Sequence, residues 1–223
     1  MSYQIAIDGP AGAGKSTIAR ALAKDLGLIY VDTGALYRAI GYYMYHNGIS
    51  IDDDAAVIVA LDGLRVSLAH VEGEQHVFVN DEDVSNRIRT PQISMAASKI
   101  SAIPGVRAFL LNLQRDIAAA HSVVMDGRDI GTVILPNADV KIFLTASPES
   151  RAERRYKELV EKGESVTLDA VLADMKKRDY DDAHRAAAPL RKADDAVEVD
   201  TSALNLEQSI ARMKEVVLEN LPK

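Results

Sequence analysis

Short apolar runs along the chain alternate with longer stretches in which apolar residues recur every three or four positions. The first run is Ile5–Ile7, and beyond a glycine-rich loop an apolar face returns at Ile18, Leu22 and Leu26. The run predicts a buried strand, and the later spacing predicts a helix that ends near Gly27.

The same alternation continues along most of the chain. Further buried strands are predicted at 28–31, 122–126, 140–144 and 195–200. Helices are predicted at 35–46, 51–61 and 206–221, and others begin near 90, 104, 147 and 167. Because strands and helices alternate, we expect a mainly parallel sheet with helices on both faces and right-handed crossovers.

A different pattern interrupts this order between residues 63 and 88. Apolar and polar residues alternate in Leu64–Leu68 and again in His76–Val79, with Gly73 between them and a turn signal at 80–84. A period of two is typical of half-exposed strands, so we expect a small antiparallel β-meander inserted at this point.

The composition fits one α/β domain with a small subdomain. The chain has 223 residues, of which 48% are hydrophobic and 26% charged. No apolar run approaches the roughly 20 residues that a membrane span needs, and we expect no signal peptide because a strand begins almost at once. The sequence contains no cysteine, which excludes disulfides and thiolate zinc sites. We therefore expect a cytoplasmic protein without a membrane partner.

The charges argue against a nucleic-acid partner. The net charge is −7, from 26 basic and 33 acidic residues, and the arginines are spread along the chain. A nucleic-acid-binding protein usually carries a basic balance or a basic patch. Scattered arginines in an acidic chain favour a pocket for a small polyanion instead.

The glycine-rich loop Gly9–Ser16 matches the phosphate-binding pattern G-x-x-x-x-G-K-[ST] and lies between a predicted strand and a predicted helix. Glycines let backbone N–H groups wrap around a phosphate, and the start of the helix adds partial positive charge. Lys15 is placed to reach the β- and γ-phosphates, and the Ser16 hydroxyl is placed to bind Mg²⁺. A glycine-rich turn that merely starts a helix is the alternative, and both the match and its context count against it.

Other candidate residues follow predicted strands. Asp126 ends an apolar run, where a carboxylate could bind the water shell of Mg²⁺ opposite a P-loop. In the next segment, Gly127–Thr132, two glycines and two charges predict a tight loop that aims Arg128 at a phosphate. Thr33 and Arg38 lie near the strand ends where α/β sheets bind ligands, although a capping role for Thr33 and a surface role for Arg38 stay open.

Two charged helices carry more arginines. The first holds a cluster of three, Arg151, Arg154 and Arg155. These could face a ligand, or could pair with glutamates on a solvated helix face. On the second helix Arg178, Asp182 and Arg185 form one stripe of alternating charge. That stripe could be internal salt bridges or a nucleotide-facing edge.

Taken together, these segments resemble the bacterial cytidylate kinases of the nucleoside monophosphate kinase group over nearly the whole chain. The matching segments are Asp8–Ser16, Asp32–Arg38, Asp126–Thr132, Arg178-Asp179 with Asp182 and Arg185, and Ala188-Pro189-Leu190. The β-meander matches an insertion that this family carries and adenylate kinases lack. The resemblance implies a P-loop NTPase-type three-layer α/β fold, with the insert in the monophosphate-binding region and a helical lid.

The resemblance implies transfer of the γ-phosphoryl group of ATP to CMP or dCMP, with Mg²⁺, by a monomer whose partners are these small substrates. A P-loop kinase for another small acceptor, such as AMP, UMP or shikimate, is an alternative that the insert and the 127–129 loop count against. A nucleotide-binding switch is a second alternative, and the Asn-Lys-x-Asp motif of a GTPase switch is absent.

The resemblance also implies a set of site residues. The catalytic set is Lys15, Arg38, Arg128 and Arg185. The ATP site comprises Gly9, Pro10, Ala11, Gly12, Ala13, Gly14, Lys15, Ser16 and Thr17, with Arg151, Arg154 and Arg155 from the lid. The acceptor site comprises Arg38, Arg128 and Arg185 for the phosphate, Ser98, Arg107 and Asp129 for cytosine with Thr33 close by, and Arg178 and Asp182 for the ribose. Ser16 and, through water, Asp126 are the expected Mg²⁺ ligands. Some family members have Ser in place of Thr33, and either residue supplies a hydroxyl.

We expect a single kinase domain over 1–223. Its core is expected to comprise 1–31, 105–147 and 194–223. The monophosphate-binding region is expected at 32–104, with the insert at about 63–88, and the lid at about 148–190.

Overall fold

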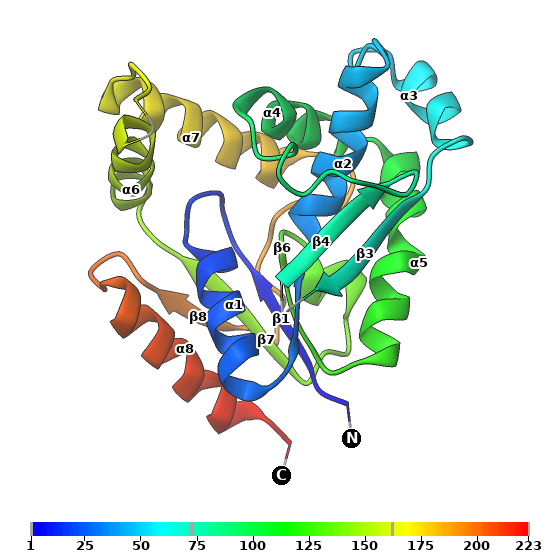
Figure 1. The fold of residues 1–223 in the computed structure, drawn as a ribbon. Helices are drawn as coiled ribbons and strands as arrows, with labels where there is room; N and C mark the ends of the chain where they lie inside the picture. Colours follow the sequence, from blue (N-terminus) through cyan, green and yellow to red (C-terminus); the bar gives the residue numbers. More distant parts are fainter. Residues whose placement is uncertain (1, 72–73, 162, 223) are drawn as a thin grey trace. The chain divides into compact units, whose positions relative to one another are not determined.

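A computed structural model of the protein describes residues 2–71, 74–161 and 163–222 (Figure 1). The chain divides into two compact units, of which the first comprises residues 1–30 and 121–223 and the second residues 31–120. No helix in the described ranges is long and apolar enough to cross a membrane.

The first unit contains the five-stranded sheet that the alternation of strands and helices predicts. Its strands are β1 (Gln4–Asp8), β2 (Ile29–Asp32, whose last two residues belong to the second unit), β6 (Val123–Gly127), β7 (Val140–Thr145) and β8 (Val197–Asp200). Their order is β2-β6-β1-β7-β8, and β1 pairs in parallel with both β6 and β7. In this register Asp8 lies opposite Gly127, which places the ends of β1 and β6 together at the carboxyl edge of the sheet.

The described part of the first unit contains four α-helices: α1 (Lys15–Leu26), α6 (Pro148–Glu161), α7 (Leu168–His184) and α8 (Leu206–Asn220). Helices α1 and α8 pack side by side over the sheet (Figure 1), where Leu22 and Met213 join Ile5 in one buried cluster. Helices α6 and α7 pack on each other through Ala152 and Met175. The predicted mainly parallel sheet covered by helices is confirmed.

The second unit contains α2 (Thr33–His46), α3 (Asp54–Leu61), β3 (Val66–Val71), β4 (Glu74–Val79), β5 (Glu82–Asp83), α4 (Pro91–Ile100) and α5 (Pro104–Ala120). Its strands form an antiparallel sheet in the order β3-β4-β5, which confirms the predicted meander. A separate cluster that includes Leu36, Ile40, Val77 and Leu110 forms the core of this unit.

Several predicted boundaries differ from the structure for reasons that are local. The turn signal at 80–84 contains only a short turn, because Asn80 and Asp81 adopt positive φ and the two-residue strand β5 follows. Helix α2 begins at Thr33 because Asp32 is its N-cap and accepts a hydrogen bond from the Ala35 N–H at 3.0 Å. The capping alternative for Thr33 is therefore wrong.

The segment after β6 differs most from its prediction. It was expected to be a tight loop over Gly127–Thr132, but Ile130–Ile134 forms a single π-helical turn. The Asp129 carbonyl accepts hydrogen bonds from Val133 N–H at 2.9 Å and Ile134 N–H at 3.2 Å. Isolated π-helical turns occur often at functional sites, and this one follows directly after Arg128 and Asp129.

Candidate functional site

The phosphate-binding loop has a backbone that only glycine allows at two positions. Gly9 has φ +152°, and a Cβ there would collide with the Leu144 carbonyl oxygen on β7. Gly12 has φ +73°, and a Cβ there would lie 2.7 Å from the Met175 Cε of α7. Of these two positions, Gly9 is fixed by the motif, and Gly12 stands at one of its variable positions.

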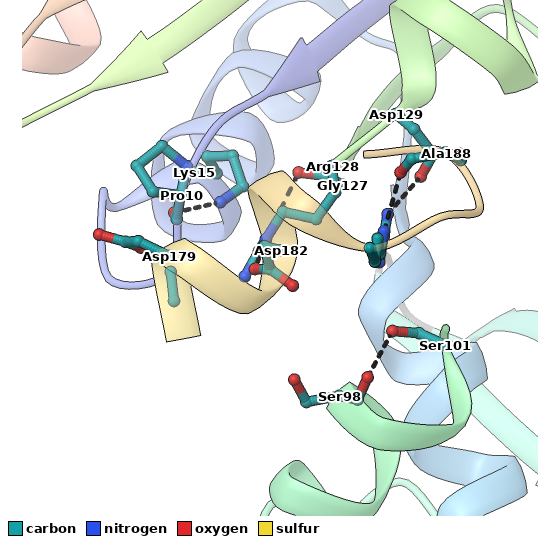
Figure 2. Close-up of polar contacts among 12 residues, drawn as sticks. Pro10, Lys15, Ser98, Ser101, Gly127, Arg128, Asp129, Asp179, Asp182 and Ala188 are labelled. Carbon is teal, nitrogen blue, oxygen red and sulfur yellow. Dashed lines mark hydrogen bonds and ion pairs between the residues drawn. The ribbon is translucent and has the colours of Figure 1, made fainter. Parts of the chain in front are cut away.

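Lys15 is buried at the start of α1, and its Nζ donates a hydrogen bond to the Pro10 carbonyl at 2.7 Å (Figure 2). Burial lowers the pKa of Lys15 well below its ordinary value, and the nearby charge of Arg128 lowers it further. The amino group of Lys15 is thus held within the phosphate-binding loop by its bond to Pro10.

A chain of three oxygen-bearing side chains lies beside the loop. The Ser16 hydroxyl donates to Asp126 Oδ2 at 2.9 Å, and the Tyr30 hydroxyl donates to Asp126 Oδ1 at 2.9 Å. Mg²⁺ takes oxygen ligands and usually binds through one or two protein groups together with substrate phosphates. Within the described residues no group of three or more His, Cys, Asp or Glu side chains gathers to hold a metal by itself. Ser16 and Asp126 therefore fit a Mg²⁺ ion that arrives with a nucleotide.

Arg128 follows β6 and donates from Nε to Asp182 Oδ2 at 2.8 Å (Figure 2). Burial tends to raise the pKa of Asp182, but the charges of Arg128, Arg178 and Arg185 and the hydrogen bond from Arg128 outweigh it, so the pKa lies below its ordinary value. Asp182 of the stripe predicted on α7 therefore forms a salt bridge with the segment after β6, as the alternative of internal salt bridges describes.

Arg185 and Asp129 form a second pair of opposite charges in the same unit. Arg185 Nη2 lies 3.6 Å from Asp129 Oδ1, and both side chains are almost fully buried. Arg185 Nε also donates to the Ala188 carbonyl at 2.8 Å, and Ala188 adopts a positive φ of 48°. The backbone beyond α7 is thus bent so that one of its carbonyls faces the guanidinium.

The three arginines of α6 have different surroundings. Arg151 is 2% exposed and donates to the Ala146 and Ala11 carbonyls, each at 2.9 Å, and to both oxygens of Asp179. Arg154 donates to the Thr201 carbonyl at 2.7 Å. The alternative of a solvated helix face is therefore wrong for Arg151.

Arg155 behaves as that alternative describes. Its side chain is 39% exposed, and Nη1 lies 3.1 Å from Oε2 of Glu158, one turn along α6. The three arginines therefore divide into two that contact backbone carbonyls within the first unit and one that forms a surface ion pair.

In the second unit Arg38 lies one turn into α2 and donates from Nη2 to Asp32 Oδ2 at 2.7 Å. Its Nε is buried and has no hydrogen-bond partner among the residues that the structure describes. Thr33 is buried beside this pair. Gln75 of β4 accepts a hydrogen bond from the Asp32 N–H at 2.8 Å, so the β-meander holds the start of α2. A partly unsatisfied guanidinium is a ready donor for an anion.

The predicted cytosine readers of the second unit lie near the junction of α4 and α5. Arg107 is buried, and its Nη1 donates to the Ser101 carbonyl at 3.3 Å. Its guanidinium carbon lies 5.8 Å from the centre of the Tyr37 ring. Ser98 is half-buried, and its carbonyl accepts from the Ser101 hydroxyl at 2.7 Å (Figure 2).

The predicted residues therefore separate by unit. The first unit brings together Lys15, Ser16, Asp126, Arg128, Asp129, Arg151, Arg178, Asp182 and Arg185. The second unit carries Thr33, Arg38, Ser98 and Arg107. The reasoning from sequence missed the partners Asp8, Tyr30 and Asp179, of which only Asp8 and Asp179 lie within recognised motifs.

Known proteins are similar to this chain over almost its whole length. A cytidylate kinase from Ligilactobacillus salivarius is 50% identical over 216 residues, which cover 97% of this chain and 96% of the relative. One from Carboxydothermus hydrogenoformans is 48% identical, covering 96% of each chain.

Solved structures give a more distant likeness. A shikimate kinase from Bacteroides thetaiotaomicron has a TM-score of 0.47 at 14% identity, covering 97% of this chain and 98% of the other. The family model described as cytidylate kinase matches residues 5–219. Together with the relatives at 48% and 50% identity, this match shows that the chain belongs to the cytidylate kinase family.

Proposed function

We propose that the protein transfers the γ-phosphoryl group of ATP to CMP or dCMP, which gives ADP and CDP or dCDP. The family and the P-loop at Gly9–Ser16 support a kinase that uses ATP. The arginines at the end of β6 and on α7, together with Arg38, support an acceptor that is itself an anion.

On the ATP side we assign the phosphates to the backbone of Gly9–Ser16 and to Lys15. Ser16 and, through water, Asp126 would hold Mg²⁺, with Tyr30 keeping the Asp126 carboxylate in place. When bound, Mg²⁺ would neutralise charge on the β- and γ-phosphate oxygens. Lys15 would leave the Pro10 carbonyl for a phosphate oxygen, and that exchange is favourable because its charge then meets an anion.

On the acceptor side we assign the monophosphate to Arg38, Arg128 and Arg185. The acceptor oxygen is already ionised at neutral pH, so no general base is needed for its attack on the γ-phosphorus. What opposes the reaction is the repulsion between two polyanions, and cations offset that repulsion. One well-placed cation can be worth about 10³-fold or more in rate.

We assign reading of the base to Asp129, Arg107 and Ser98, and contact with the ribose to Arg178 and Asp182. A carboxylate accepts from the exocyclic amino group of cytosine, and a guanidinium donates to the ring acceptors. UMP offers a carbonyl where CMP offers that amino group, so the buried Asp129 carboxylate would face a second acceptor, which it repels.

Arg154 and Arg155 of α6 are assigned to a helical lid, formed by α6 and α7, that contacts ATP. Arg155 is the freer of the two, since its partner Glu158 lies at the surface. Closing the lid would exclude water, which could otherwise take the γ-phosphoryl group in place of CMP. Arg151, with four oxygen partners inside the first unit, would support the P-loop more than it contacts the nucleotide.

The observation that carries this proposal is two ion pairs in the same unit as Lys15: Arg128–Asp182, which is partly buried, and Arg185–Asp129, which is almost fully buried. It is tested by measuring ADP release with ATP and Mg²⁺ and, separately, CMP, dCMP, UMP and AMP. We expect the highest kcat/KM with CMP or dCMP and little turnover with AMP. Turnover with AMP or UMP alone would keep the kinase reaction but overturn the assignment of the base-reading residues.

A further inference from the structure

A buried carboxylate that the reaction does not use directly joins the two loops of the first unit. Asp8 is the last residue of β1, immediately before the P-loop, and is 5% exposed. Its Oδ1 accepts from the Ile130 N–H at 2.7 Å, and its Oδ2 accepts from the Gly131 N–H at 2.7 Å. Both oxygens of one side chain are therefore directed at consecutive amides of the segment after β6.

Those two amides open the π-helical turn Ile130–Ile134. The first N–H groups of a helical turn lack partners within the turn and must find them elsewhere. Here the partner is a side chain from a neighbouring strand, so Asp8 acts as a cap supplied from outside the turn. The path of the backbone as it leaves Arg128 and Asp129 is thereby fixed to the end of β1.

Lys141 of β7 also lies close to this turn. A Cβ on Gly131 would lie 3.2 Å from Lys141 Cδ and 3.4 Å from Asp8 Oδ2, so the two side chains leave no space for a side chain at Gly131. The Lys141 Nζ is itself held by both oxygens of Asp195, at 2.9 and 2.7 Å. The turn therefore has little room to shift while both side chains are in place.

This arrangement is electrostatically costly. Burial raises the pKa of Asp8 to about 6, against the lowering effect of the Gly131 and Ile130 amides. The nearby charge of Asp129 raises it further, and that of Lys15 lowers it. Groups whose pKa is strongly perturbed by burial cluster at functional sites.

We propose that Asp8 is a positioning residue for the acceptor: through the Ile130 and Gly131 amides it holds Arg128 and Asp129 in register with the P-loop that follows it. This inference rests on the proposed function, because it assigns Arg128 and Asp129 to CMP. Asp8 contacts neither substrate. Removing the Asp8 carboxylate displaces Arg128 and Asp129 more than it displaces the P-loop. The P-loop backbone has close neighbours of its own at Leu144 and Met175.

The test compares Asp8→Asn with Asp139→Asn. Asp139 Oδ2 accepts from the Gln4 N–H at 2.7 Å, so it makes the same kind of contact with the other end of β1. Asp8→Asn keeps the shape of the side chain but turns an amide NH₂ toward one of the two N–H groups. We expect kcat/KM for CMP to fall about ten- to a hundredfold, the equivalent of one hydrogen bond to a charged group, while KM for ATP stays within about twofold. Asp139→Asn should change neither constant.

Two further measurements keep the test decisive. Gly131→Ala, which crowds the turn between Asp8 and Lys141, should lower kcat/KM for CMP in the same direction by about threefold, the effect of a shift of a few tenths of an ångström. In ¹H–¹⁵N spectra the Ile130 and Gly131 amide protons should resonate downfield in the wild type and move upfield in Asp8→Asn. That readout does not depend on activity.

The outcomes distinguish a failure of the proposed function from a failure of the role proposed for Asp8. If the wild type fails to phosphorylate CMP, the proposed function fails, and with it the role of Asp8 toward that acceptor. If the wild type is active and Asp8→Asn leaves kcat/KM for CMP unchanged, the inference alone is overturned. Equal losses toward CMP and ATP, or equal losses in Asp139→Asn, would also overturn it, because they indicate a general structural role.

Discussion

Arg128 donates a hydrogen bond from Nε to Oδ2 of Asp182 at 2.8 Å, joining the segment after β6 to helix α7 across 54 residues of sequence. The pKa of Asp182 lies below its ordinary value because Arg128, Arg178 and Arg185 outweigh the effect of burial. The carboxylate is therefore ionised throughout the neutral range and holds Arg128 in one orientation.

Asp182→Asn keeps the size of the side chain and removes the negative charge that pairs with Arg128. We expect kcat/KM for CMP to fall about ten- to a hundredfold and the free energy of unfolding to fall by about 1–3 kcal/mol, because Arg128 loses a charge-assisted partner. The control is Asp181→Asn, whose carboxylate pairs with Lys177 at the surface. The control should shift stability by about 0.5 kcal/mol or less, and similar losses in both variants would contradict a special role for Asp182.

Lys15→Met removes the ammonium group and keeps the apolar stem. We expect kcat to fall by about 10³-fold or more, since Lys15 is assigned to the transferred phosphoryl group. Urea unfolding should show a folded protein with nearly unchanged stability, because a desolvated charge is lost together with its hydrogen bond to Pro10. Turnover close to that of the wild type would show that the loop does not bind the reacting phosphates.

Alanine substitutions of Arg151 and Arg155 should have different effects on stability and on KM for ATP. Arg151→Ala should lower the free energy of unfolding by about 3 kcal/mol or more, because Asp179 and the Ala146 and Ala11 carbonyls lose the hydrogen bonds that Arg151 donates. Arg155→Ala should change stability by about 0.5 kcal/mol or less and raise KM for ATP. If Arg155→Ala leaves KM for ATP unaltered, Arg155 has no place in the lid.

Asp129→Ala should change which base is preferred. We expect the ratio of kcat/KM for CMP to that for UMP to fall by about tenfold or more, because the variant no longer offers an acceptor to the amino group of cytosine. KM for ATP should change far less. A ratio equal to that of the wild type would remove Asp129 from the base-reading role and leave it as the partner of Arg185.

The contribution of Asp8 to the stability of the protein should fall as pH rises. Burial raises the pKa of Asp8 from 3.8 to about 6 in the folded protein, so the folded state binds this proton more tightly than the unfolded chain. The contribution to stability is present at low pH and is lost as pH rises through about 6.

Urea unfolding of the wild type and Asp8→Asn at pH 5 and pH 7.5 isolates this contribution. The stability of the wild type relative to the variant should be greater at pH 5 by about 1 kcal/mol. A relative stability that is constant, or greater at pH 7.5, would show that Asp8 is not a raised-pKa group in the folded protein.

Local patterns predicted much of the fold and part of the site. The P-loop was recognisable because eight consecutive residues, Gly9–Ser16, carry both the spacing and the strand and helix on either side. The parallel sheet followed from the order of apolar runs, and the contact of Ser16 with Asp126 follows from the pairing of β1 with β6.

The rest depends on partners that periodicity cannot identify. Asp8 was visible only as part of a motif, because its partners lie 122 and 123 residues away. Arg151 was indistinguishable from Arg155 along the helix, yet one binds buried oxygens and the other a surface glutamate. The positive φ of Asn80 and Asp81 shortened the turn to two residues and left room for β5. The pattern of residue types along the chain indicates burial and spacing. It does not indicate which donor bonds to which acceptor in the folded chain, and the partners of Asp8 and Arg151 depend on that.

The most direct test of the central claim is the product balance of a reaction that contains the wild-type protein, ATP, Mg²⁺ and CMP. Separation of the nucleotides should show ADP and CDP formed in equal amounts, with no inorganic phosphate beyond that of a reaction without protein. ADP accompanied by an equal amount of inorganic phosphate, and no CDP, would contradict the account, because it would mean that water and not CMP accepts the phosphoryl group.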